Sequence, residues 1–251
     1  MKASYQGVRK AVLTRAVHLL ERELRPHAGY GSSSYAQCGE DLIVRYLFQL
    51  CGIPQPSYVD IGAHHPYYLS NTALFYISGS RGVNIEPNPL LITEFNRQRP
   101  ADVNLNIGVA SLEGQLEFHC FEDATLSTFS EAEAETLIRA GHKETACIPV
   151  PVLPLEKIVE QYCAGRFPDF LTIDVEGFET EILSTIDYAR NYPKIICVET
   201  ANYSPTGRGG KRQELMEFVE EQGYVLYADT NLNSIYIKEE LWGTANNEPG
   251  Q

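Results

Sequence analysis

The sequence predicts an α/β fold, with a mostly parallel sheet, helices on both faces and an antiparallel hairpin at the C-terminal end. Short apolar runs rich in β-branched residues alternate with stretches of helical period. Such alternation is typical of βαβ units, whose strands lie parallel in one sheet. Two final runs, 223–228 and 234–238, are separated by a five-residue polar turn, which is typical of a hairpin.

The composition is that of an ordinary globular protein. The chain has 251 residues, of which 43% are hydrophobic and 21% charged, so it can bury a substantial core. A formal net charge of −13 disfavours nucleic acid as a partner, because an acidic surface repels phosphate backbones. The six cysteines are scattered, without zinc-type spacing, which favours reduced thiols. With no secretory signal and no apolar stretch long enough to cross a membrane, we expect a cytoplasmic chain.

Residues 1–33 are predicted to form an N-terminal helix and a linker, ahead of one domain over residues 34–251. Residues 6–24 have helical period with an apolar face, and residues 27–34 are rich in glycine and serine. The helix is expected to pack on the domain or on a partner. The chain itself could form a homo-oligomer.

The alternating pattern assigns the remaining elements in order. Strands are expected at 57–61, 82–86, 103–109, 114–120, 169–175 and 194–199. Helices are expected at 39–51, 69–78, 88–98 and 178–190. An acidic helix around 131–140 interrupts the alternation. With residues 123–130 it is either a lid over the site or an ordinary surface excursion.

Four of the predicted strands end in acids, Asp60, Glu86, Asp174 and Glu199. In an open parallel sheet, ligands bind beyond these carboxyl ends, where unpaired charges are costly. Asp60 is followed by Gly62, which permits a tight turn with close backbone approach to a ligand. Glu86 comes about 25 residues later, at the spacing of the ribose-binding acid in dinucleotide folds. A solvated helix start is the alternative for Glu86, but the pair together favours nucleoside binding.

Several motifs, taken in order, resemble the FkbM-type S-adenosylmethionine-dependent methyltransferases. The three main ones are Asp60-Ile-Gly-Ala, Asn84-Ile-Glu-Pro-Asn-Pro and Thr172-Ile-Asp-Val-Glu-Gly-Phe-Glu. Two more resemble one branch of the family, Tyr35-Ala-Gln-Cys-Gly-Glu-Asp and His64-His-Pro followed by Ser70-Asn-Thr. The resemblance covers about residues 34–240.

This resemblance implies a class I methyltransferase with a Rossmann-like, seven-stranded sheet and S-adenosylmethionine as cofactor. Asp60 and Gly62 would border its methionine part, Glu86 would bind the ribose, and Gln37 would contact the amino-acid end. The implied cofactor-binding residues are Gln37, Asp60, Gly62, Ala63, Glu86, Asn106, Val109 and Asp174, with Asn106 and Val109 near the adenine. Family members mostly methylate hydroxyl groups, so we expect a sugar acceptor in a glycan, glycolipid or glycosylated natural product.

A sugar hydroxyl is a poor nucleophile at neutral pH, so a base or a metal must remove its proton. Asp174 is the expected base, and His64 and His65 are the alternatives. The other interpretation of the two histidines is loop structure. A divalent cation, Mg²⁺ or Mn²⁺, is a second route, because Asp174, Glu199 and Asn202 offer oxygen ligands at neighbouring strand ends.

Glu179 is expected to face solvent on its helix, and the tyrosines at 67, 68 and 76 to pack or stack on sugar. A nicotinamide-dependent oxidoreductase is an alternative function, although the G-x-G-x-x-G fingerprint is absent. A non-catalytic cofactor-binding module would keep Asp60 and Glu86 without needing Asp174.

Overall fold

The computed structural model describes residues 31–175, 177–202 and 209–245. The chain divides into two compact units, Met1–Ser33 and Ser34–Gln251, and the following description concerns the second. The helix predicted at 6–24 lies outside the described residues, so the N-terminal helix and linker stay a prediction. No helix in the described part of the chain is long and apolar enough to cross a membrane.

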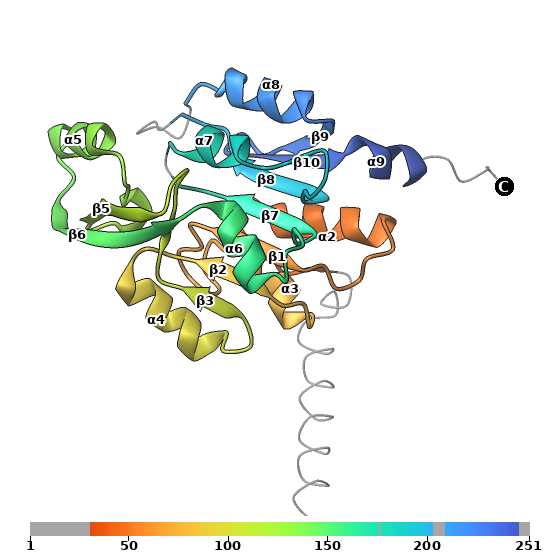
Figure 1. Cartoon of the computed structure of the whole chain (residues 1–251), viewed down its shortest axis with the longest axis horizontal. Helices are drawn as coiled ribbons and strands as arrows, with labels where there is room; N and C mark the ends of the chain where they lie inside the picture. Colours follow the sequence, from red (N-terminus) through yellow and green to blue (C-terminus); the bar gives the residue numbers. More distant parts are fainter. Residues whose placement is uncertain (1–30, 176, 203–208, 246–251) are drawn as a thin grey trace, which may run out of the picture. The chain divides into compact units, whose positions relative to one another are not determined.

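Seven strands of the described residues form the main sheet (Figure 1). Its parallel strands are β1 (Tyr58–Ile61), β2 (Gly82–Ile85), β3 (Val103–Leu105), β7 (Phe170–Ile173) and β8 (Ile195–Glu199). A hairpin completes it, in which β10 (Asn233–Lys238) pairs antiparallel with both β8 and β9 (Tyr224–Asp229). The strand order is β3-β2-β1-β7-β8-β10-β9, so the predicted mostly parallel sheet with its C-terminal hairpin is confirmed.

Helices cover both faces of this sheet, as predicted. Every residue of β1 and β7 is buried, as expected for parallel strands covered on both sides. One face packs on α6 (Leu155–Tyr162), α7 (Glu179–Ser184) and α8 (Gln213–Glu221). The other face packs on α2 (Glu40–Leu50), α3 (Ala73–Ile77) and α9 (Glu239–Ala245). The sequence pattern did not predict α6, α8 or α9.

Two of the predicted helices are shorter than expected. The helix predicted at 69–78 begins only at Ala73, because Leu69 has a positive φ of 54° and the Ser70 hydroxyl accepts from the Ala73 N–H. The helix predicted at 178–190 ends at Ser184. The sequence explains why α4 (Pro89–Gln98) begins where it does, because Asn88 caps it and proline occupies the first helical position.

A second, three-stranded sheet departs from the prediction. The single strand expected at 103–109 was wrong, because β3 ends at Leu105 and the chain then enters β4 (Gly108–Val109). β4 pairs with β6 (Glu144–Leu153), which pairs antiparallel with β5 (Gly114–Phe121). β5 is connected to β6 through a short helical turn, η2 (Ala124–Leu126), and α5 (Glu131–Arg139). Residues 108–153 therefore form an insertion, which lies beside the main sheet at the left of Figure 1.

Candidate functional site

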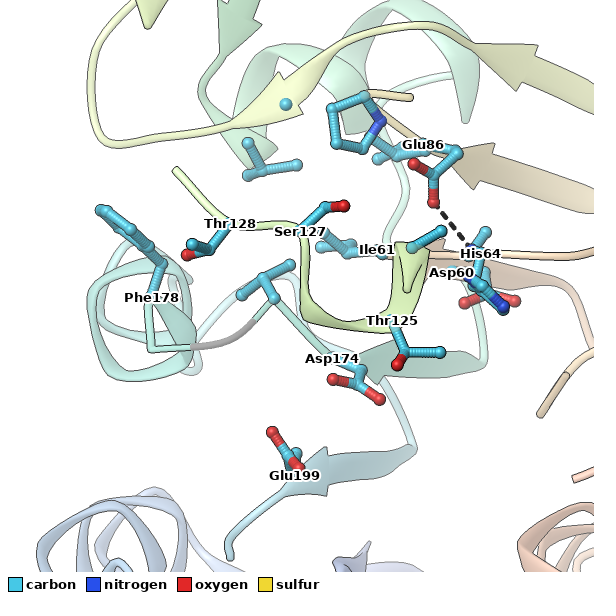
Figure 2. Close-up of a pocket in the computed structure, with 18 of the residues that line it drawn as sticks. Asp60, Ile61, His64, Glu86, Thr125, Ser127, Thr128, Asp174, Phe178 and Glu199 are labelled. Atoms are coloured by element: carbon cyan, nitrogen blue, oxygen red, sulfur yellow. Dashed lines mark hydrogen bonds between the residues drawn. The ribbon is translucent and has the colours of Figure 1, made fainter. Parts of the chain in front are cut away.

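The carboxyl ends of the parallel strands surround a cavity of about 470 Å³ (Figure 2). A cavity of this size is within the range that holds small ligands and cofactors. The main sheet supplies the strand ends on one side, and residues 123–129 of the insertion supply another wall. The predicted site residues that line it are Gln37, Asp60, Gly62, Ala63, His64, Glu86, Val109, Asp174 and Glu199.

Three predicted site residues lie outside the lining of this cavity. His65 Nδ1 accepts hydrogen bonds from the backbone N–H groups two and three residues later, so its ring holds the loop. The Asn106 amide donates to the carbonyl oxygens of Glu86 and Pro87, at 2.9 and 2.8 Å, and thereby fixes the end of β2. Asn202 is exposed. Their predicted catalytic, cofactor and metal roles stay predictions.

Glu86 is the carboxylate at the end of β2, and only 5% of it is exposed. Its Oε2 accepts from the His64 N–H at 2.8 Å and its Oε1 from the Asn88 N–H at 2.7 Å. Burial raises the pKa of Glu86 to about 8, although these two backbone donors act in the opposite direction. When Glu86 is ionised, each oxygen keeps a second lone pair, so the carboxylate can then accept two ligand hydroxyls.

A chain of buried hydrogen bonds holds the carboxylate of Asp60 in place. The Thr72 hydroxyl donates to Asp60 Oδ2 at 2.5 Å, and Arg99 Nη1 donates to that hydroxyl at 3.0 Å. Arg99 is itself fully buried in an ion pair with Asp102. Burial raises the pKa of Asp60 to about 6, and the Thr72 hydrogen bond and the Arg99 charge limit this rise. The sequence did not point to Arg99, and it pointed to Thr72 only as part of the Ser70-Asn-Thr motif.

Gly62 allows the ends of β1 and β7 to come together. Its φ is +77°, and a Cβ atom there would lie 1.8 Å from the carbonyl oxygen of Asp174. The neighbouring Asp174 N–H donates to the Ile61 carbonyl at 3.0 Å. The sequence predicted a close approach between the backbone at Gly62 and a ligand. In the structure this backbone lies close to the main chain of Asp174.

The carboxylates of Asp174 and Glu199 point toward one another at the same edge of the cavity (Figure 2). The two residues follow Ile173 and Val198, which are paired in the β7–β8 ladder. Partial desolvation by the surrounding protein raises the pKa of Asp174 although its side chain is exposed at the cavity, and the charges of Glu179, Asp60 and Glu40 raise it further. A carboxylate with a raised pKa is suited to accept a proton near neutral pH.

The expectation that Glu179 faces solvent was wrong, because its side chain is fully buried. Its Oε1 accepts from the N–H groups of Val175 and Gly177, both at 3.2 Å, and its Oε2 pairs with Arg212. Because α7 begins at Glu179, the side chain can reach back to the preceding loop. Glu179 therefore fixes the loop that follows Asp174.

The segment 123–129 forms a wall of the cavity, which favours the covering role over a simple surface excursion. It is tied to β5 by two main-chain hydrogen bonds between Thr128 and His119, at 2.9 and 3.1 Å. Among the described lining residues, none belongs to α5. The wall is thus the loop and not the helix that follows it.

His64 lies at the cavity edge with a φ of +53°. Burial lowers its pKa, so the imidazole is neutral at physiological pH. A neutral imidazole can accept a proton, and His64 therefore stays the alternative base.

A family model for the methyltransferase FkbM domain matches residues 60–226. The chain belongs to the FkbM methyltransferase family. This confirms the resemblance derived from the strand-end motifs. The matched FkbM region begins at Asp60 itself and includes Glu86, Asp174, Glu199 and the whole insertion, so it contains most of the cavity wall.

Solved structures of methyltransferases are among those similar to this chain. Methyltransferase FkbM from Methylobacillus flagellatus is 12% identical, with a TM-score of 0.41, over 73% of this chain and 43% of that chain. A TehB-like SAM-dependent methyltransferase from Corynebacterium glutamicum is 13% identical, with a TM-score of 0.41, over 90% of this chain and 99% of that chain. This FkbM chain thus spans less than half the length of the first structure. No curated protein matches it.

Proposed function

We propose that the chain is an S-adenosylmethionine-dependent O-methyltransferase that methylates a sugar hydroxyl in a glycan, glycolipid or glycosylated natural product. One observation carries the proposal. A single cavity holds both Glu86, which can accept two hydroxyls, and Asp174, whose raised pKa suits a proton acceptor. Membership of the FkbM family supports methyl transfer as the reaction.

The cofactor side of the cavity is built on β1 and β2. Glu86 binds the ribose hydroxyls, and its two backbone donors keep the carboxylate in place. Asp60 accepts the cationic amino group of the methionine part, oriented by Thr72. When bound, S-adenosylmethionine supplies an activated methyl group, so the main task of the protein is to position the acceptor.

The acceptor side is built on β7 and the insertion. Asp174 takes the proton from the acceptor hydroxyl, which makes the oxygen a better nucleophile. Tyr68 also lines the cavity and is 62% exposed, so its ring is available to stack on a sugar. Tyr67 and Tyr76 instead contact Gln98 and Arg99, which supports packing roles for them. The carboxylates at this edge favour a neutral or cationic sugar.

A divalent cation fits this site only in part. Asp174 and Glu199 face one another and supply two oxygen ligands. Asn202, the expected third ligand, is exposed and outside the cavity lining. We therefore propose that Asp174 acts as the base without Mg²⁺ or Mn²⁺, and full methyl transfer after exhaustive chelation is the result that supports this.

The proposal is tested in two steps. Calorimetric titration should show binding of S-adenosylmethionine and none of NAD(H), which separates methyl transfer from a nicotinamide-dependent oxidoreductase. Mass spectrometry of nucleotide-sugars and glycan extracts should then show an acceptor that gains one CH₂ group. Cofactor binding without any such product would instead indicate a non-catalytic module.

The base is identified with two variants. Asp174→Asn should lower kcat by about 10²- to 10⁴-fold while the cofactor still binds. His64→Gln is the comparison, because it removes the alternative base from the same cavity. A larger loss of kcat in His64→Gln than in Asp174→Asn would transfer the role to the histidine.

A further inference from the structure

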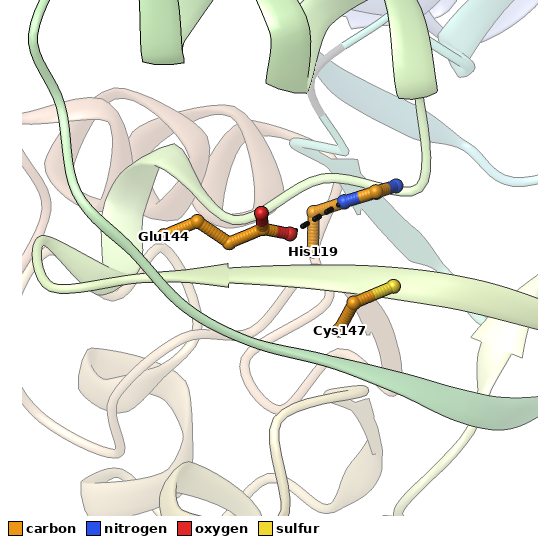
Figure 3. Close-up of side chains that lie close together, drawn as sticks. All are labelled: His119, Glu144 and Cys147. Atoms are coloured by element: carbon orange, nitrogen blue, oxygen red, sulfur yellow. Dashed lines mark hydrogen bonds and ion pairs between the residues drawn. The ribbon is translucent and has the colours of Figure 1, made fainter.

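The outer face of the insertion carries a group of side chains that the proposed function does not use. Successive residues of a strand point to opposite faces, and on β5 Leu116 and Phe118 line the cavity. His119 therefore points to the other face, where it is paired directly with Cys147 of β6. Figure 3 shows that Glu144 lies beside both.

A β-bulge explains how Glu144 reaches this group. Glu144 and Cys147 are three positions apart, so regular alternation would place them on opposite faces. The register shifts between Cys120 and Phe121, which sets Phe121 opposite Glu144. An extra residue in one strand turns the following side chain to the other face, and Glu144 thereby joins Cys147 and His119.

The three side chains are close enough to share one ion. Within the described part of the chain, they form the one group of at least three His, Cys, Asp or Glu residues whose ligand atoms all lie within 4.8 Å of one another. His119 Nδ1 lies 2.7 Å from Glu144 Oε1, and the Cys147 thiol donates to Glu117 Oε2 at 3.3 Å. Glu117 thus adds a further negative charge beside the group.

We propose that His119, Glu144 and Cys147 bind a zinc ion, with water as the fourth ligand. Imidazole, carboxylate and thiolate are the ligand types of tetrahedral zinc, and the thiolate disfavours Mg²⁺ and Ca²⁺. Cys147 is exposed and the other two ligands are half-buried, so the ion can enter from solvent.

The zinc ion would act on the cavity wall through the main chain. His119 exchanges two backbone hydrogen bonds with Thr128, which lines the cavity. Fixing the side chain of His119 therefore restrains segment 123–129 from the opposite face of the sheet. This site is independent of which reaction the cavity catalyses.

The test is titration of the metal-free full chain with Co²⁺ and with Zn²⁺. Co²⁺ should give the visible bands of a tetrahedral site together with a thiolate charge-transfer band. Cys147→Ser should abolish the charge-transfer band, and His119→Gln and Glu144→Gln should each weaken Zn²⁺ binding by at least about tenfold. Cys38→Ser is the matched control, because Cys38 is also exposed but lies outside the group, and it should bind as the unaltered chain does.

Hydrogen exchange supplies a second readout that does not depend on any variant. Zn²⁺ should slow exchange of the backbone amides of His119 and Thr128, and it should leave those of the main sheet unchanged. Co²⁺ binding without a thiolate band, or equal Zn²⁺ affinity in Cys147→Ser, would overturn the site. Unchanged exchange at Thr128 would overturn its link to the wall. Since neither measurement needs cofactor or acceptor, failure here leaves the proposed methyl transfer untouched.

Discussion

The carbonyl oxygen of Asp174 occupies the space where a side chain at Gly62 would be. A Cβ atom at Gly62 would lie 1.8 Å from that oxygen. Asp60, two residues before this glycine, and Asp174 are the acids of neighbouring strand ends. The spacing of the two carboxylates therefore depends on the absence of a side chain between their strands.

Gly62→Ala should destabilise the fold strongly, because the added methyl group meets main-chain atoms that cannot move without separating β1 from β7. A positive φ alone costs an alanine about 1–2 kcal/mol. Gly52→Ala isolates that cost, since Gly52 has a φ of +68° and open space around its Cβ position. Chemical denaturation should show a clearly greater loss for Gly62→Ala, and equal losses would mean that the strand ends adjust freely.

Arg99→Met should lower the free energy of unfolding by about 3–5 kcal/mol, because it leaves the buried Asp102 carboxylate without its cation. It also removes the donor that orients Thr72 toward Asp60. Arg97→Met is the matched control, since Arg97 lies two positions before Arg99 and makes a largely exposed pair with Glu94, and it should change stability little. Denaturation of both variants checks this, and similar midpoints would contradict the structural role of Arg99.

Glu86→Ala should weaken S-adenosylmethionine binding by about 1–3 kcal/mol, or roughly 5- to 150-fold in Kd, because two ribose hydroxyls lose their acceptor. Calorimetric titration measures this, with circular dichroism to check the fold. Glu94→Ala removes a half-exposed acid from the neighbouring helix α4 and should leave Kd unchanged. Unchanged affinity in Glu86→Ala would remove the ribose role from this residue.

Stability should fall as pH rises from about 5 to about 8. The folded-state pKa values of Glu86 and Asp60, about 8 and about 6, lie above their ordinary values, so the folded chain binds these protons more tightly than the unfolded chain. Their stabilisation is therefore complete below the ordinary pKa and is lost as pH rises through the folded value. Each group contributes up to about 1.4 kcal/mol per pH unit.

Glu86→Gln tests this pH dependence directly. The variant has no proton to lose at position 86, so its stability should change less between pH 6 and 8 than that of the unaltered chain. Glu94→Gln should keep the original slope, because Glu94 has a lowered pKa and does not titrate in that range. Parallel curves for the unaltered chain and Glu86→Gln would show that Glu86 is ionised throughout.

The sequence predicted the main sheet well because its strands are buried on both faces and read as short apolar runs. The acids at strand ends also reached the cavity as expected, since parallel strands deliver their carboxyl ends to one edge. Strand β6 was missed because Pro149 and Pro151 interrupt its pattern, and proline is uncommon within a paired strand.

The residues that support the site could not be predicted from local sequence patterns. Arg99 reaches Asp60 only through Thr72, and Glu179 turns back on the loop before its own helix. The Arg99 contact depends on which distant segments the fold brings together, and Glu179 also pairs with the distant Arg212. For Glu179 the sequence held one signal. It is an acid in the first turn of a helix, where the helix dipole favours a negative charge.

The two sides of the cavity come from separate stretches of the chain. The strand ends of the main sheet form one side, and segment 123–129 of the insertion forms the other. A new wall can therefore evolve without repacking the core that carries Glu86 and Asp174. Exchanging residues 110–143 between related chains should alter which acceptors are chosen while the methyl donor stays the same. Under the proposed function, the methyl donor and the acceptor would therefore be held by different parts of the chain, and a change of acceptor would not require a change in the main sheet.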